Sequence, residues 1–148
     1  MKYVSRQAMD TSAVLKLYRS EPNSQLVRAC IDSEATLILS ELVRIEVVSA
    51  TFGLVRQGME SKAAADRLIE AFDSDYASYV TLPFDGEVIH EAERLLLKYA
   101  STVSLRPMDA FHLATALIEH GRNPLDSFVT TDKVLISIAK IEGLVVKP

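Results

Sequence analysis

The stretch Leu105–Leu117, Leu-Arg-Pro-Met-Asp-Ala-Phe-His-Leu-Ala-Thr-Ala-Leu, predicts a helix around which the rest of the chain is organised. Pro107 suits the first turn of a helix, where its missing N–H group is not needed. Small and apolar residues then recur at helical spacing, at Ala110, Leu113, Ala114 and Leu117. This face should therefore belong to the core. Asp109 lies in the first turn beside it, where the helix dipole favours a carboxylate, so Asp109 taken alone has a local explanation.

The composition predicts one folded domain over residues 1–148. This length suits a single hydrophobic core and is too short for two domains of ordinary size. Hydrophobic residues make up 49% of the chain, which argues against disorder, yet no apolar run is long enough to span a membrane. The N-terminus has no apolar signal-peptide region, and the single Cys30 excludes an internal disulfide or a cysteine-based zinc site. We therefore expect a soluble, cytoplasmic protein.

The charge balance limits how the chain can meet nucleic acid. The net charge is −4 and the isoelectric point is about 5.4, which argues against a protein that holds nucleic acid on a broad basic face. It does not argue against an enzyme that meets phosphates through a bound metal ion, because divalent ions reverse the local charge of an acidic site.

Apolar runs bounded by turn residues alternate with helical patterns along the chain. Strands are expected at residues 3–9, 36–39, 79–82, 127–130 and 144–146. Arg6 and Gln7 interrupt the first of these strands. Helices are expected from Thr11 or Ser12 to Tyr18, then at about 24–32, 41–57 after a Ser40 cap, 61–73, 85–99, 105–121 and 132–143. This alternation predicts an α/β fold with a mostly parallel sheet covered by helices on both faces.

Four carboxylates fall on one rim of the predicted sheet. Asp10 and Asp132 follow expected strands directly. Glu46 lies slightly more than one turn into the helix after the second strand, and Asp109 opens the helix before the fourth. Because ligands of open α/β sheets bind beyond the carboxyl ends of the strands, we expect these side chains to converge.

Glu46 is the most informative of the four, because its helical neighbours are apolar and no cation lies on its own face. Burying an unpaired charge costs several kcal/mol, so either the side chain reaches solvent or a positive group meets it. Asp10 and Asp132 have an alternative explanation as helix caps. Clustered carboxylates would repel one another, and a dication would relieve that repulsion. Oxygen ligands without cysteine or paired histidine favour Mg²⁺ or Mn²⁺, which orient a phosphodiester and activate water.

Other side chains near these acids have ordinary structural explanations. His112 follows Asp109 by about one turn and is a candidate to face the site, although helix packing is its expected role. Arg44, Arg56 and Lys133 are candidates to contact phosphates, but isolated charges of this kind are usually solvated surface. The expected hairpin of residues 41–73 carries more apolar residues than one buried face needs, at Phe52, Val55, Leu68 and Phe72. An exposed apolar stripe would mark a two-fold dimer interface.

Four segments together resemble a known family. They are Met-Asp-Thr-Ser-Ala-Val-Leu-Lys-Leu-Tyr (9–18), Ser-Glu-Leu-Val-Arg-Ile-Glu-Val-Val-Ser-Ala (40–50), Met-Asp-Ala-Phe-His-Leu-Ala-Thr-Ala-Leu (108–117) and Val-Thr-Thr-Asp-Lys-Val-Leu (129–135). These segments look like the four acidic motifs of PIN-domain ribonucleases. Their order and spacing resemble the VapC-type toxins of toxin–antitoxin pairs, and the similarity spans nearly the whole chain. The interrupted first strand departs from the family, which usually runs an unbroken apolar strand into the first Asp.

The resemblance implies a fold, an activity and partners. It implies a three-layer α/β/α sandwich and a Mg²⁺- or Mn²⁺-dependent endoribonuclease that cleaves single-stranded RNA. The metal-binding and catalytic carboxylates would be Asp10, Glu46, Asp109 and Asp132, and the supporting hydroxyls would be Ser12 and Thr130. It also implies a homodimer that a cognate antitoxin inhibits. We expect that small partner to carry a basic segment, because the cleft it would block is acidic.

Two alternatives belong to other functional classes. A catalytically idle PIN-like domain would bind proteins without cutting RNA, which the complete set of four acids argues against. A phospho-acceptor receiver domain also clusters acids at strand ends, but it expects a second acid beside the first and a Lys after the last strand. Here Asp10 is followed by Thr11 and Ser12.

Overall fold

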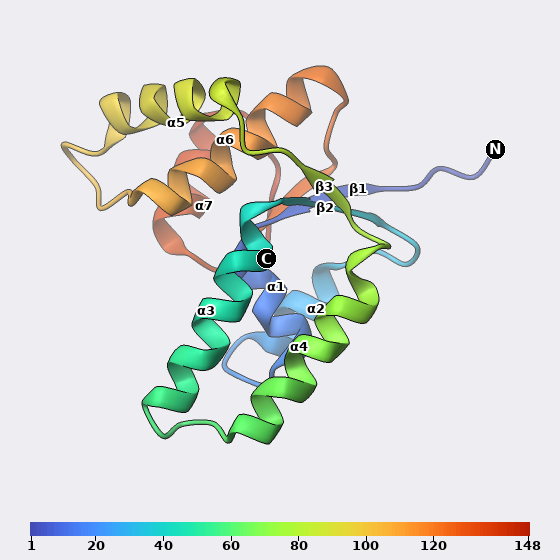
Figure 1. Cartoon of the computed structure of the whole chain (residues 1–148). Coiled ribbons are helices and arrows are strands. Elements are labelled where there is room, and N and C mark those ends of the chain that lie inside the picture. The colour runs from blue at the N-terminus through green and yellow to red at the C-terminus, as the bar shows by residue number, and fades with distance from the viewer.

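The computed structural model describes residues 1–148 and contains a five-stranded parallel sheet between two helical layers (Figure 1). The strands are β1 (Arg6–Met9), β2 (Thr36–Ser40), β3 (Val80–Leu82), β4 (Ser127–Val129) and β5 (Val146–Lys147). The helices are α1 (Thr11–Tyr18), α2 (Ser24–Cys30), α3 (Leu42–Arg56), α4 (Lys62–Tyr76), α5 (Gly86–Tyr99), α6 (Pro107–Arg122) and α7 (Lys133–Ile141). The predicted α/β sandwich is confirmed. No helix combines the length and the apolar character that a bilayer crossing requires.

The strand order is β3-β2-β1-β4-β5, and every pairing in the sheet is parallel. Strands β2 and β3 lie on one side of β1, and strands β4 and β5 lie on its other side. Neighbouring strands β1 and β4 are therefore the point at which the winding reverses. In open α/β sheets, the crevice beyond the carboxyl ends of such a pair is the usual ligand site.

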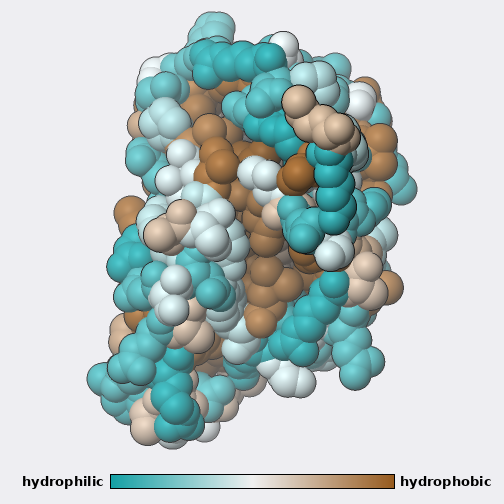
Figure 2. Space-filling view, turned by 90° about the vertical axis from the view of Figure 1, so that its right-hand side faces the viewer, coloured by the Kyte–Doolittle hydropathy of each residue, from teal (hydrophilic) through white to brown (hydrophobic).

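Side chains that alternate along the strands divide the core between the two faces of the sheet. Ala8, Ile38 and Phe128 pack with the upper layer of Figure 1, formed by α5, α6 and α7. Met9, Leu39 and Val129 pack with the lower layer, formed by α1 to α4. Figure 2 views the molecule from the right of Figure 1, where the N-terminus lies, and shows a narrow apolar band bordered by polar residues.

Gln7 lies inside the first strand and does not interrupt it. Its side chain is fully buried, donates hydrogen bonds to the Cys30 carbonyl (3.0 Å) and the Ser127 hydroxyl (2.9 Å), and accepts one from the Asp32 N–H (2.8 Å). A buried amide with all of these partners is tolerated in a core. The strand begins at Arg6 and not at residue 3, because pairing with β2 starts at Arg6.

Several predicted boundaries are wrong by a few residues. The start of α1 is not among them: Asp10 is its N-cap, since its carboxylate accepts the Ala13 N–H, and the helix begins at Thr11. Ser40 ends β2, where it pairs with Leu82, and Glu41 takes the N-cap position of α3. The last strand is shifted toward the C-terminus, because Val146 and Lys147 are the residues that pair with β4, while Leu144 fills the core. The second helix ends at Cys30.

The antiparallel hairpin of α3 and α4 extends away from the sheet (Figure 1). The prediction that its apolar residues exceed one buried face is wrong for Phe72, which is fully buried and packs edge to face with Tyr18 and Tyr76. The large apolar side chains that do remain exposed on the hairpin are Ile45 (67%) and Met59 (62%).

Replacing Gln7 with Leu should destabilise the protein by about 2–4 kcal/mol, because the Cys30 carbonyl, the Asp32 N–H and the Ser127 hydroxyl lose a buried partner. Urea unfolding followed by circular dichroism measures the change. The control is Gln25→Leu, at an exposed position on α2, which should stay within about 0.5 kcal/mol of the unmodified chain. Equal stabilities for both variants would contradict a structural role for the Gln7 network.

Candidate functional site

Asp10 occupies the first position beyond β1 and is 2% exposed. Its carboxylate accepts hydrogen bonds from the Ala13 N–H (3.0 Å), the Ser12 hydroxyl (2.9 Å) and the Thr130 hydroxyl (2.8 Å). Burial raises the pKa of Asp10 above its ordinary value, although these hydrogen bonds and the attraction of His112 oppose the rise. Asp10 is thus a helix cap as expected, but it is also a buried carboxylate held by two hydroxyl groups at the carboxyl end of β1.

Thr130 joins the ends of β1 and β4. Its side chain is fully buried, donates its hydroxyl hydrogen to Asp10, and accepts the backbone N–H of Asp132 at 3.1 Å. Asp132 in turn caps α7 by accepting the Leu135 N–H at 2.9 Å. The structure therefore places Asp10 and Asp132 on the two sides of the β1/β4 switch point, connected through one hydroxyl group.

Asp109 lies in the first turn of α6, two residues after Pro107, and its side chain is 23% exposed. Burial raises the pKa of Asp109, and the negative charges of Asp132 and Glu46 raise it further, against attraction from Arg106 and His112. The nearest opposite charge is Arg106, whose Nε lies 3.5 Å from Asp109 Oδ2. Asp132 and Glu46 are therefore close enough to Asp109 to act on it electrostatically.

Glu46 is met from two other helices. Its Oε1 accepts the Thr11 hydroxyl of α1 at 2.7 Å and contacts Nε2 of His112 of α6. Burial raises the pKa of Glu46, but the hydrogen bond and attraction from His112 and the hydrogen bond from Thr11 outweigh burial and leave it below its ordinary value. The sequence predicted that Glu46 either reaches solvent or is met by a positive group. The contact with the His112 ring is of the second kind. Helix packing is the favoured explanation for His112 from the sequence, and facing the site is the alternative; its ring contacts this carboxylate, as the alternative predicts.

An open pocket of about 440 Å³ lies beside these acids and is lined by Glu46, Arg106, Pro107, Met108 and Asp109. The side chain of Arg106 is 77% exposed at its mouth. Sequence reasoning missed this residue, although its position three residues before Asp109 on the same helix start places the two side chains together. The pocket is large enough for part of an extended polar ligand and carries both signs of charge.

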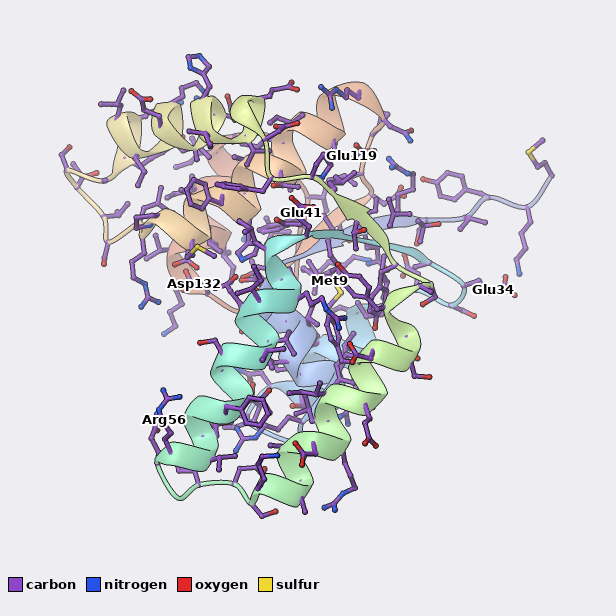
Figure 3. The ribbon with its side chains drawn as sticks, viewed as in Figure 1. Met9, Glu34, Glu41, Arg56, Glu119 and Asp132 are labelled. Carbon is purple, nitrogen blue, oxygen red and sulfur yellow. The ribbon has the colours of Figure 1, made fainter.

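The other basic candidates are placed less favourably. Arg44 pairs with Asp73 and lies over the ring of Tyr76. Arg56 is ten residues beyond Glu46 on α3, about 15 Å along the helix axis, and Figure 3 shows it at the opposite end of α3 from Asp132. Lys133 is exposed and adjoins Asp132 in the chain.

The donors around the crevice are carboxylate and hydroxyl oxygens, the ligands that Mg²⁺ and Mn²⁺ prefer. The repulsion that raises the pKa of Asp109 is the kind that a dication relieves. The residues present therefore fit a hard divalent ion in chemical type. No three carboxylate, imidazole or thiol groups of the chain lie close enough together to hold a metal ion directly in this conformation.

Solved structures with the same fold cover nearly the whole chain. FitAcB from Neisseria gonorrhoeae has a TM-score of 0.70 at 21% identity and covers 96% of each chain. VapC20 from Mycobacterium tuberculosis, described as a Sarcin-Ricin loop cleaving toxin, has a TM-score of 0.66 at 16% identity over 96% of this chain and 99% of its own. A toxin–antitoxin complex from Klebsiella pneumoniae has a TM-score of 0.57 at 13% identity over 85% and 86%. At these identities the likeness establishes the fold.

Sequence comparison establishes the family. Residues 8–141 match the PIN domain. Two curated proteins of Mycobacterium tuberculosis are similar to the chain: Ribonuclease VapC46 is 32% identical over 108 residues, covering 73% of this chain and 72% of its own, and Ribonuclease VapC47 is 30% identical over 141 residues, covering 93% and 92%. With the PIN match across the sheet and both helical layers, and with relatives of this identity and coverage, the chain belongs to the PIN-domain family and, within it, to the VapC ribonucleases.

Proposed function

We propose that the chain is a Mg²⁺- or Mn²⁺-dependent endoribonuclease that cleaves single-stranded RNA and serves as the toxin of a toxin–antitoxin pair. The observation that carries the proposal is Asp10, buried at the β1/β4 switch point and held by Thr130; the repulsion that Asp132 and Glu46 exert on Asp109 supports it. The relatives named as ribonucleases and the neighbour described as a Sarcin-Ricin loop cleaving toxin support the same activity. An RNA substrate also supports action in the cytoplasm.

The proposed roles follow from the contacts of each side chain. The metal ligands would be Asp10, Glu46, Asp109 and Asp132, and the supporting hydroxyls would be Ser12 and Thr130. A bound dication would supply an activated water and stabilise the charge that develops on the phosphate. Ser12 and Thr130 orient the carboxylate of Asp10 through their hydrogen bonds. Arg106, exposed at the mouth of the neighbouring pocket, is placed to bind an RNA phosphate beside the cleaved bond.

The proposal includes inhibition of the nuclease by a separate antitoxin protein. A nuclease with this site needs restraint, and the Klebsiella neighbour is a toxin–antitoxin complex. The acids around the crevice favour a small partner with a basic segment, because its Arg or Lys would compete with the metal for the same charges. We also propose a homodimer formed through the α3–α4 hairpin, since Ile45 and Met59 are exposed there.

An idle PIN domain that only binds proteins is the remaining alternative from another class. The raised pKa of Asp109, caused by burial and by the nearby charges of Asp132 and Glu46, argues against it, because an idle domain has no need to keep these acids together. Family membership removes the receiver-domain alternative. The metal experiment below separates a nuclease from an idle domain.

RNA cleavage should require a divalent ion. The purified protein is expected to cut single-stranded RNA with Mg²⁺ or Mn²⁺, to stop in EDTA, and to recover when Mn²⁺ is added in excess, because the donors around Asp10 are hard oxygens. A gel assay with labelled RNA measures this. Undiminished cleavage after exhaustive chelation would contradict metal dependence, and no cleavage under any metal would favour the idle domain.

Asp109→Asn should lower the rate of RNA cleavage more than roughly 100-fold. That loss is larger than the loss typical of residues that only support a metal ligand. In EDTA at neutral pH its free energy of unfolding should equal or exceed that of the unmodified chain, because the raised pKa of Asp109 means that its ionised form destabilises the fold. The gain should disappear as the pH falls below the ordinary pKa of Asp, where protonation removes the same charge. Urea unfolding across pH measures it.

The control for this variant is Asp85→Asn, which makes the same chemical change at the N-cap of α5, where Asn also caps well. It should keep full cleavage. If Asp109→Asn is destabilised and still cuts RNA, Asp109 serves only the helix dipole.

The proposed antitoxin should bind and inhibit. We expect the product of the small open reading frame beside the gene to co-purify with the chain and to suppress cleavage, and replacement of one basic residue of that partner should restore cleavage while binding persists. Pull-down and RNA cleavage measure the two effects. A bound partner that leaves cleavage at full rate would contradict blocking of the acidic crevice.

A further inference from the structure

We propose that His112 and Thr11 are positioning residues that orient Glu46 for the divalent ion, an inference that rests on the proposed function. The geometry concerns one carboxylate and two donors from different helices. Thr11 of α1 donates its hydroxyl to Glu46 Oε1 at 2.7 Å, and Nε2 of His112 of α6 contacts the same oxygen. The two donors also lie near each other, at 3.2 Å between Thr11 Oγ1 and His112 Nε2.

Glu46 needs such donors because its place in the fold differs from that of the other acids. Asp10 and Asp132 are N-caps, so backbone N–H groups of the following helix orient them. Asp109 lies in a first turn, beside Arg106. Glu46 lies inside α3, where the backbone N–H groups are already used by the helix and none is free to bind a side chain. The Glu46 side chain is 27% exposed, so without these donors it would be free to turn toward solvent.

Both contacts fall on Oε1, which leaves Oε2 as the oxygen available to a cation. One oxygen held by the protein and one offered to a metal is the usual arrangement of a carboxylate ligand with supporting partners. The donor Thr11 comes from α1, the helix that Asp10 caps. The donor His112 comes from α6, the helix that carries Asp109. Orientation of Glu46 therefore depends on the same helix ends that place two other proposed ligands.

Packing alone does not explain a histidine at position 112. Its side chain is 2% exposed, and Nδ1 is buried with no hydrogen-bond partner. A buried polar atom without a partner costs stability, and an apolar side chain of similar size would avoid that cost. The ring is thus retained for the contact that Nε2 makes with Glu46.

The experiment measures Mn²⁺ affinity directly, by the loss of the free-ion signal in electron paramagnetic resonance. His112→Leu removes the donor and keeps an apolar core residue, and Thr11→Val removes the second donor with little change of shape. Each should raise the Mn²⁺ dissociation constant by roughly 10- to 100-fold. His112→Gln restores an N–H near the position of Nε2 and should recover most of the affinity. The control is His90→Leu, on an exposed position of α5, which should bind Mn²⁺ normally.

Unfolding in EDTA shows whether each variant is folded, and the Thr11 variant tests the proposal separately if His112→Leu is not. If the unmodified chain binds no Mn²⁺ and cuts no RNA, the proposed function fails. If it does both while folded His112→Leu and Thr11→Val bind Mn²⁺ normally, the positioning roles fail and the nuclease stands. A direct ¹⁴N coupling to bound Mn²⁺ that His112→Leu removes would also overturn the inference, because the imidazole would then be a ligand.

Discussion

The hydrogen bond from Thr130 to Asp10 is the contact on which the rest of the site depends. It joins the ends of β1 and β4, two neighbouring strands from which the chain winds in opposite directions. The same hydroxyl accepts the backbone N–H of Asp132, so one buried side chain ties the end of β1 to the start of α7. Repulsion between acids would otherwise separate these loops, and the parallel pairing of β1 with β4 opposes that separation.

The layers on either side of the sheet deliver the remaining acids to this point. Helix α3 brings Glu46 from the lower layer, and α6 brings Asp109 from the upper layer. Because each helix is anchored by a separate core cluster, the crevice is a junction between two independently packed halves. Its shape is therefore set by how both clusters pack against the same strands.

The sequence predicted the parts that obey local rules. A strand followed by Asp at a helix start predicted the positions of Asp10 and Asp132, and apolar periodicity predicted the helices of both layers. It could not predict contacts between distant segments. Gln7 looked like an interruption, because its partners at Cys30, Asp32 and Ser127 are identified only after folding. The partner of Glu46 was missed for the same reason, since His112 lies on another helix.

The separation of Asp10 and Thr130 in the chain, 120 residues, has a consequence for synthesis. Strand β1 is made first but lies in the middle of the sheet, and its neighbour β4 is made almost last. At about 5–20 residues per second, the ribosome releases β4 many seconds after β1. The pairing of β1 with β4, and the contact of Thr130 with Asp10, therefore cannot form until β4 has been made. A truncated product that stops before β4 never acquires the Thr130 contact to Asp10.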